Sequence, residues 1–281
     1  MSKKKKIKHP LPIKIIGWLF PKVEKLAPSI AKRWFVHIFF SPVRFKVPYG
    51  EQDARIEAKK GTLEYNGNKI QYYIWGEGKP VLFCHGWMGR GTQFRKFIPV
   101  FNNAGYQVVS FDAKAHGLSE GKKSHLMEFA DITIMMHEEF GPFEMIVGHS
   151  LGGVAALHAI HQGVEASKLV MISSPTLKGK IIEPFKKSIK ASEGSKLYLE
   201  NYVQKKYGQP FETYDAVYIA QSLRPIDILL IHDEDDNEVD LSNSTGFMDV
   251  YPQAKRVTTK GLGHTRILKD DQVIEAVLKH L

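Results

Sequence analysis

Residues 148–153 read GHSLGG and combine a nucleophile with glycines on both sides. The segment directly follows the apolar run at residues 145–148 and directly precedes a helical pattern. A serine hydroxyl is a weak nucleophile near neutral pH, so it needs a neighbouring base and an exposed position. A sharp strand-to-helix turn gives that exposure, and Gly148 and Gly152 leave room for the backbone around it. The segment therefore predicts a nucleophilic serine, Ser150, at a helix start that favours negative charge.

With this motif between a strand and a helix, the chain from residue 61 to residue 281 resembles the α/β-hydrolase family. Two further stretches match that family in its order, HGWMG at residues 85–89 and DAKAHGLS at residues 112–119. The resemblance implies that an acid and then a histidine follow the nucleophile along the chain. It also implies that the stretch at residues 112–119 is a structural loop beside the active site.

Candidate acids crowd residues 232–238, which read HDEDDNE and follow the apolar run at residues 228–231. Superposed on the family pattern, Asp236 falls on the triad acid, and Asp235 remains the alternative. Asp233 stands where the family usually has glycine. Carboxylates this crowded would disfavour each other's ionisation if they were buried, so most of them are expected in solvent.

The candidate base is His264, in the glycine-containing loop GLGHT at residues 261–265. A histidine has an ordinary pKa of about 6.5, so it can take the serine proton and return it to the leaving group. The resemblance implies that Asp236 fixes the tautomer of this imidazole and stabilises its protonated form.

Charge that develops on the substrate oxygen needs two N–H donors. The resemblance assigns them to the backbone of Leu151, directly after the nucleophile, and of Trp87, in the loop after the strand at residues 81–84. The side chains of Trp87 and Met88 would then line a substrate pocket, and His85 would orient the loop.

A scaffold must position these side chains, and the pattern of apolar and polar residues along the chain predicts one. Two alternating runs, at residues 62–65 and 70–75, flank an Asn-Gly turn and predict a hairpin. Short apolar strands then alternate with helical stretches, which predicts an α/β fold with a mostly parallel sheet covered by helices on both faces. The expected strands are 81–84, 107–111, 145–148, 169–172 and 228–231, and the expected helices are 92–103, 126–139, 151–161 and 270–280.

Three regions are expected along the chain. Residues 1–60 form a basic N-terminal arm with an amphipathic helix over residues 28–40. Residues 61–172 and 226–281 form the hydrolase core. Residues 173–225, rich in tyrosine and lysine, interrupt the alternation of strands and helices and predict a helical cap inserted in the sheet. The apolar stripe of the amphipathic helix is expected to pack on the body, with a membrane interface as the alternative.

Positive charge is concentrated at the start of the chain. Residues 1–46 hold 12 Lys or Arg and a single acid, Glu24, whereas the rest of the chain is nearly neutral. This distribution argues against a nucleic-acid groove across the domain, and it suits a contact between residues 1–46 and an anionic membrane. A solvated tail is the alternative. No run reaches the ~18 apolar residues of a membrane span, so we expect a cytoplasmic protein with at most peripheral attachment.

Together the motifs predict a serine hydrolase that cleaves carboxylic esters or thioesters of small molecules through a covalent acyl-enzyme, with no cofactor and no metal. A peptidase, a lysophospholipase or a C–C hydrolase could use the same residues, because fold and triad do not fix the substrate. A ligand-binding member with low turnover is an alternative of another class. Cys84 is the single cysteine, so no disulfide can form within the chain.

Overall fold

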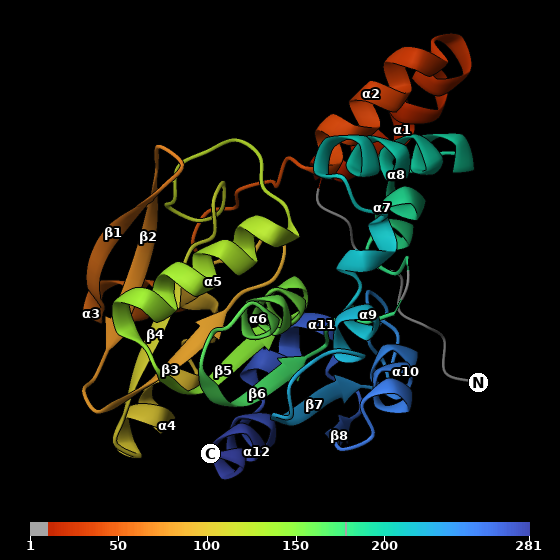
Figure 1. Ribbon diagram of the computed structural model, residues 1–281. Helices are drawn as coiled ribbons and strands as arrows, with labels where there is room; N and C mark the ends of the chain where they lie inside the picture. The colour runs from red at the N-terminus through yellow and green to blue at the C-terminus, as the bar shows by residue number, and fades with distance from the viewer. Residues whose placement is uncertain (1–10, 178) are drawn as a thin grey trace.

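The structure is a computed structural model that describes residues 11–177 and 179–281. The lysine run at residues 3–6 and Lys178 lie outside the described residues. In the described part, an eight-stranded sheet has the order β1-β2-β4-β3-β5-β6-β7-β8 (Figure 1). Its strands are β1 (Lys59–Tyr65), β2 (Asn68–Trp75), β3 (Lys79–Cys84), β4 (Tyr106–Phe111), β5 (Phe143–His149), β6 (Ala166–Ile172), β7 (Asp227–Asp233) and β8 (Lys255–Thr259).

The predicted antiparallel edge and parallel centre are both confirmed. β1 pairs with β2, and β2 pairs with β4, in antiparallel register. Every other neighbouring pair is parallel. Because parallel strands all end at the same edge, the loops after β3, β5 and β7 gather there.

Helices cover both faces of the sheet, as predicted. On one face, β3 buries Leu82 and Cys84 with residues of α5 (Leu126–Phe140), α6 (Leu151–His161), α9 (Ala216–Ala220) and α10 (Ser242–Val250). On the other face, β3 buries Val81 and Phe83 with residues of α3 (Gln52–Glu57), α4 (Phe97–Asn103) and α12 (Asp271–His280). The central strands are therefore buried on both sides, which explains their continuous apolar runs.

One predicted helix differs from the structure. The stretch 92–103 is divided into the 3₁₀ turn η2 (Gly91–Phe94) and the short α4. Pro99 lies in the first turn of α4, where its missing N–H removes no helical hydrogen bond, so a helix that starts well before it is disfavoured. The remaining short elements are the 3₁₀ turns η1 (Tyr49–Glu51), η3 (Phe211–Tyr214) and η4 (Ile267–Lys269), and the helix α11 (Gly263–Arg266).

The N-terminal helices lie beside two helices of the predicted cap rather than on the sheet. α1 (Leu11–Leu26) and α2 (Pro28–Phe39) pack against α7 (Ile182–Ile189) and α8 (Glu193–Tyr207), apart from the sheet (Figure 1). Phe20, Phe35 and Leu199 are fully buried in this separate apolar cluster. The two helices before the core and the insertion after β6 thus form one helical layer.

The sequence pattern predicted α2 but not α1. Pro21 lies inside α1, where a proline removes a backbone hydrogen bond and disfavours the helix. Packing on α7 supports the helix nonetheless, since a Cβ at Gly17 would come within 2.9 Å of the Ser188 carbonyl oxygen. Within the described residues, no helix combines the length and hydropathy that a membrane span requires.

Candidate active site

Ser150 occupies a sharp turn between β5 and α6, as the motif predicted. Its φ is 52° and its ψ is −124°, a strained conformation for a residue with a side chain. A Cβ at Gly148 would lie 2.3 Å from the Gly153 Cα, and a Cβ at Gly152 would lie 2.2 Å from the Cys84 carbonyl oxygen. Gly148 therefore allows the start of α6 to fold back on β5, and Gly152 allows it to lie against the end of β3.

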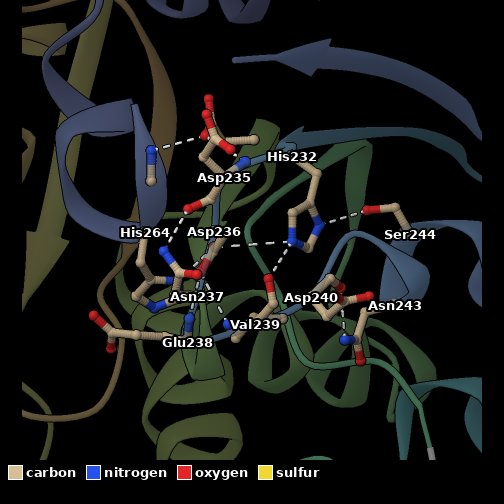
Figure 2. A network of polar contacts seen from close by, with 12 residues as sticks. His232, Asp235, Asp236, Asn237, Glu238, Val239, Asp240, Asn243, Ser244 and His264 are labelled. Atoms are coloured by element: carbon tan, nitrogen blue, oxygen red, sulfur yellow. Dashed lines mark hydrogen bonds and ion pairs between the residues drawn. The ribbon is translucent and has the colours of Figure 1, made fainter. Parts of the chain in front are cut away.

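Asp236 and His264 meet at the carboxyl edge of the sheet. Asp236 follows β7, and His264 lies in the short helix α11 after β8. The Nδ1–H of His264 donates to Oδ2 of Asp236 at 2.8 Å, a contact drawn in Figure 2. The other carboxylate oxygen accepts the backbone N–H groups of Glu238 and Val239, each at 2.9 Å. These bonds leave Nε2 as the imidazole nitrogen that is turned away from the acid.

The two groups perturb each other's pKa in opposite directions. Burial acts to raise the pKa of Asp236, but the hydrogen bond and charge of His264 outweigh it and hold that pKa below its usual value. Burial acts to lower the pKa of His264, but the hydrogen bond and charge of Asp236 raise it above the usual value. The pair is thus suited to an ionised acid beside an imidazole that accepts a proton readily.

The crowded acids divide into partnered buried groups and solvated groups. Asp235, the alternative triad acid, is exposed, whereas the Asp236 side chain is fully buried. His232 lies near Asp236: its Nε2–H donates to the Val239 carbonyl, and its Nδ1 accepts from the Ser244 hydroxyl (Figure 2). The geometry therefore favours Asp236 over Asp235 as the partner of His264.

Asp233 replaces the glycine that the family usually has, and the structure gives it a function as a loop anchor. Its carboxylate accepts the backbone N–H groups of Leu262 and Gly263 at 3.0 and 2.9 Å and the Thr259 hydroxyl at 2.7 Å. Burial acts to raise the pKa of Asp233, but these hydrogen bonds outweigh it and lower that pKa. Asp233, which departs from the family pattern, thus fixes the loop that carries His264.

His149 joins the loop of His264 to the turn of Ser150. The Nε2–H of His149 donates to the His264 carbonyl at 2.9 Å, and the two rings lie 4.8 Å apart between centroids. Its Nδ1 accepts from the Gln93 amide at 3.4 Å, and burial lowers the pKa of His149 to about 3, so the ring is neutral. The sequence argument used this residue only as a spacer in the motif.

No hydrogen bond joins the Ser150 hydroxyl to His264 among the described residues. The link between the two segments is His149, which directly precedes Ser150 and bonds to the backbone carbonyl of His264. Catalytic hydrogen bonds are often long in the absence of substrate and tighten when it binds.

The loop after β3 lies directly against Ser150. A Cβ at Gly86 would come within 2.8 Å of the Ser150 Cβ. The Gly89 N–H donates to the Gly86 carbonyl at 2.9 Å, which closes a turn with Trp87 and Met88 at its centre, and Met88 has a φ of 59°. Leu151 is the first residue of α6, where N–H groups have no acceptor within the helix. Both predicted N–H donors thus belong to backbone beside Ser150.

His85 orients this loop through two hydrogen bonds of its ring, as the resemblance implied. Its Nδ1–H donates to the Gly86 carbonyl at 2.7 Å, and its Nε2 accepts the Ala113 N–H at 2.9 Å. Burial, followed by the nearby His116, keeps the pKa of His85 well below its usual value, so the ring is neutral. The Trp87 ring packs edge-on against His116 at 5.0 Å between centroids. A contact of Trp87 or Met88 with substrate stays a prediction.

Two buried acids, Glu51 and Asp112, support the same loop through contacts that the sequence did not reveal. Arg90 pairs with Glu51 at 3.2 Å, and both side chains are nearly buried. Glu51 also accepts the Thr92 hydroxyl at 2.8 Å. Asp112 accepts the N–H groups of Gly91 and Leu118, both at 2.8 Å, which supports a structural role for its loop.

A surface cavity between α3, β2 and α4 contains none of these residues. It is lined by Asp53, Trp75, Arg95 and Asn102 among others, and so is not part of the site. In residues 11–177 and 179–281, no group of three or more His, Cys, Asp or Glu side chains has an arrangement that could hold a metal ion.

The fold is that of the α/β hydrolases, and comparison with known proteins agrees. The family model described as alpha/beta hydrolase fold matches residues 79–274. Because the match spans well over half of the chain, the protein belongs to the α/β hydrolase family.

Curated relatives match only part of this chain. A non-heme haloperoxidase from Rhodococcus erythropolis is 30% identical over 114 residues, which cover 39% of this chain and 42% of the relative. The proline iminopeptidase PfmaB from Pestalotiopsis fici is 33% identical over 119 residues, with the same coverage. The chain thus matches less than half the length of these relatives.

Solved structures show the same fold over more of the chain. An esterase from Pyrococcus furiosus has a TM-score of 0.65 and 20% identity, with 86% of this chain and 97% of the esterase covered. A bromoperoxidase from Bacillus anthracis has a TM-score of 0.63 and 20% identity, with 79% of this chain and 99% of that structure covered. At this level of identity the likeness shows the fold alone.

Proposed function

We propose that the protein is a serine hydrolase that cleaves carboxylic esters or thioesters of small molecules. The observation that carries the proposal is the 2.8 Å hydrogen bond between His264 and the buried Asp236, held beside the strained turn of Ser150. The nucleophile Ser150, the acid Asp236 and the base His264 follow one another along the chain in the order of the family.

In the proposed reaction, Ser150 Oγ attacks the acyl carbon while His264 Nε2 takes the hydroxyl proton. The carbonyl oxygen becomes an oxyanion that accepts the backbone N–H groups of Trp87 and Leu151. The C–O or C–S bond to the leaving group then breaks, and His264 returns the proton to the alcohol or thiol. Water, deprotonated by His264, hydrolyses the acyl-enzyme, releases the carboxylic acid and regenerates the Ser150 hydroxyl.

Asp236 has a positioning and electrostatic role in this scheme. It holds Nδ1 protonated, so Nε2 is free to accept the proton from Ser150. Its lowered pKa keeps it ionised while His264 is charged, and its burial strengthens that attraction. His149, neutral and bonded to the His264 carbonyl, holds the base beside the nucleophile.

Peptide cleavage is the second candidate, because a proline iminopeptidase is among the partial relatives. Halogenation is a third activity to assay, given the haloperoxidase relatives. An ester or thioester has a better leaving group than an amide, so its cleavage needs less assistance from a general acid.

The test is activity-based labelling with a fluorophosphonate probe, followed by a series of p-nitrophenyl esters of increasing chain length. We expect the probe to label the wild-type protein and Ser167→Ala, an exposed serine control, but not Ser150→Ala. Ester turnover should follow the same pattern. Absence of label on a folded wild-type protein would overturn the proposal, and label without ester turnover would favour the peptidase.

A further inference from the structure

Helix α1 has two apolar faces, and only one of them is covered. Phe20 is fully buried, and Ile16 and Val23 pack beside it against the cap helices. The opposite face exposes a second apolar set at helical spacing, with Trp18 65% exposed and Leu26 84% exposed. The members of this outer face are Leu11, Ile15, Trp18, Leu19 and Leu26.

The charges beside the outer face are all positive. Lys14, Lys22 and Lys25 are exposed on α1, and the ammonium group of Lys22 lies 3.1 Å from the centroid of the Trp18 ring. Glu24 is the one acid of α1, and it points toward the cap, where it accepts the Ser192 hydroxyl at 2.7 Å. No acid of α1 therefore neutralises the lysines of the outer face.

Two features of this face decide what could cover it. A second copy of the chain, docked through the same face, would bring lysines against lysines with no acid of α1 between them. A polyanion without apolar groups would satisfy the lysines but leave the leucine, isoleucine and tryptophan side chains in water. An anionic lipid surface offers both partners, since acyl chains accept the apolar side chains and phosphate groups accept the lysines.

We propose that α1 is a membrane-docking helix that lies in the interface of an anionic bilayer. Leu11, Ile15 and Trp18 insert between the lipid headgroups, and Lys14, Lys22 and Lys25 reach the phosphates beside them. The buried face stays packed on the cap, so docking requires no unfolding of α1. The proposal is independent of the proposed hydrolase activity.

The test is flotation of the full chain with lipid vesicles, carried out on Ser150→Ala so that no lipid is cleaved. We expect binding to vesicles of phosphatidylcholine with about one third phosphatidylglycerol to be at least tenfold tighter than to phosphatidylcholine alone. Ile15→Gln combined with Trp18→Gln should weaken binding at least ~10-fold. The matched control, Tyr49→Gln with Ile56→Gln, changes two exposed apolar residues outside α1 and should leave binding unchanged.

Fluorescence locates the contact. Trp18 is the exposed tryptophan, so vesicles should shift the emission to the blue, and Trp18→Phe should abolish most of that shift while it retains binding. Equal binding by the α1 variant and its control would overturn the proposal. Absence of binding to anionic vesicles would also overturn it, and so would a dimer in light scattering that the α1 variant alone abolishes.

Discussion

The carboxyl edge of the sheet and the outer face of α1 depart from ordinary packing in opposite ways. At the sheet edge, ionisable groups such as Asp233, Asp236 and His264 are removed from solvent. On α1, large apolar groups such as Trp18 and Leu26 are left in it. Buried charge and exposed apolar surface are the two informative departures from the usual distribution of residues.

The difference between the two regions lies in their partners. Asp233, Asp236 and His264 are each hydrogen-bonded within the chain, and burial together with these bonds shifts their pKa values, as is common at functional sites. The apolar side chains on the outer face of α1 lie in no apolar cluster of residues 11–177 and 179–281, which points to a surface outside the chain. The contacts of the first region are made within the protein, whereas we propose that the second region is covered by a membrane surface.

The largest effect on kcat is expected from replacing the base, His264. His264→Ala removes the proton acceptor, so kcat for p-nitrophenyl ester hydrolysis should fall by about 10⁴- to 10⁶-fold with folding intact. His161→Ala, an exposed histidine at the end of α6, should leave kcat unchanged. A reduction of less than tenfold in His264→Ala would show that the buried groups are structural only.

Asp236→Asn should lower kcat by about 10⁴-fold, because an amide at this position selects the wrong imidazole tautomer. Asp235→Asn is the control, since Asp235 is exposed and its substitution should change kcat less than twofold. A large loss of kcat in Asp235→Asn with little loss in Asp236→Asn would assign the triad acid to Asp235. The hydrogen bond between His264 and Asp236 would then have no catalytic role.

Asp233→Asn tests whether a buried acid anchors the histidine loop. The amide would direct N–H groups at the N–H donors of Leu262 or Gly263, so the free energy of unfolding should fall by about 2 kcal/mol. Urea denaturation measures this loss. Glu234→Gln, at the exposed neighbouring position, should stay within about 0.5 kcal/mol of wild type.

A smaller effect is expected on the pH dependence of kcat/KM. The base acts only when neutral, so kcat/KM should rise with pH as His264 loses its proton. Because Asp236 raises the pKa of His264, the midpoint of this rise should lie above the ordinary histidine value of about 6.5. The residual activity of Asp236→Asn should rise at a lower pH, because the negative charge is gone. An unshifted midpoint in the variant would show that Asp236 does not set the pKa of the base.

The smallest effect is expected on the outer face of α1. Ile15→Gln with Trp18→Gln should leave the free energy of unfolding within about 0.5 kcal/mol of wild type, because both side chains are already in water. Phe20→Ala, on the buried face of the same helix, should lower it by about 3 kcal/mol. A large loss in the outer-face variant would mean that these residues already have a partner within the chain.

The sequence predicted the elements that depend on local pattern. The strands, the hairpin edge and the helix after Ser150 follow from apolar runs, an Asn-Gly turn and paired glycines, which act over a few residues. It also proposed Ser150, Asp236 and His264, since their order matches the family. It did not predict α1, because Pro21 disfavours a helix locally and packing on α2 and α7 supports it.

Residue order and local pattern thus determined the class of fold and the residues that could react. Only the tertiary structure showed that Asp236 rather than Asp235 bonds to His264, gave Asp233 its anchoring contacts and joined His149 to His264. Only the tertiary structure, too, showed that the described residues leave one face of α1 exposed. The physical reason is that burial and partner choice depend on groups far apart in the chain. Neighbouring carboxylates are alike in sequence and differ only in what the folded chain places against them.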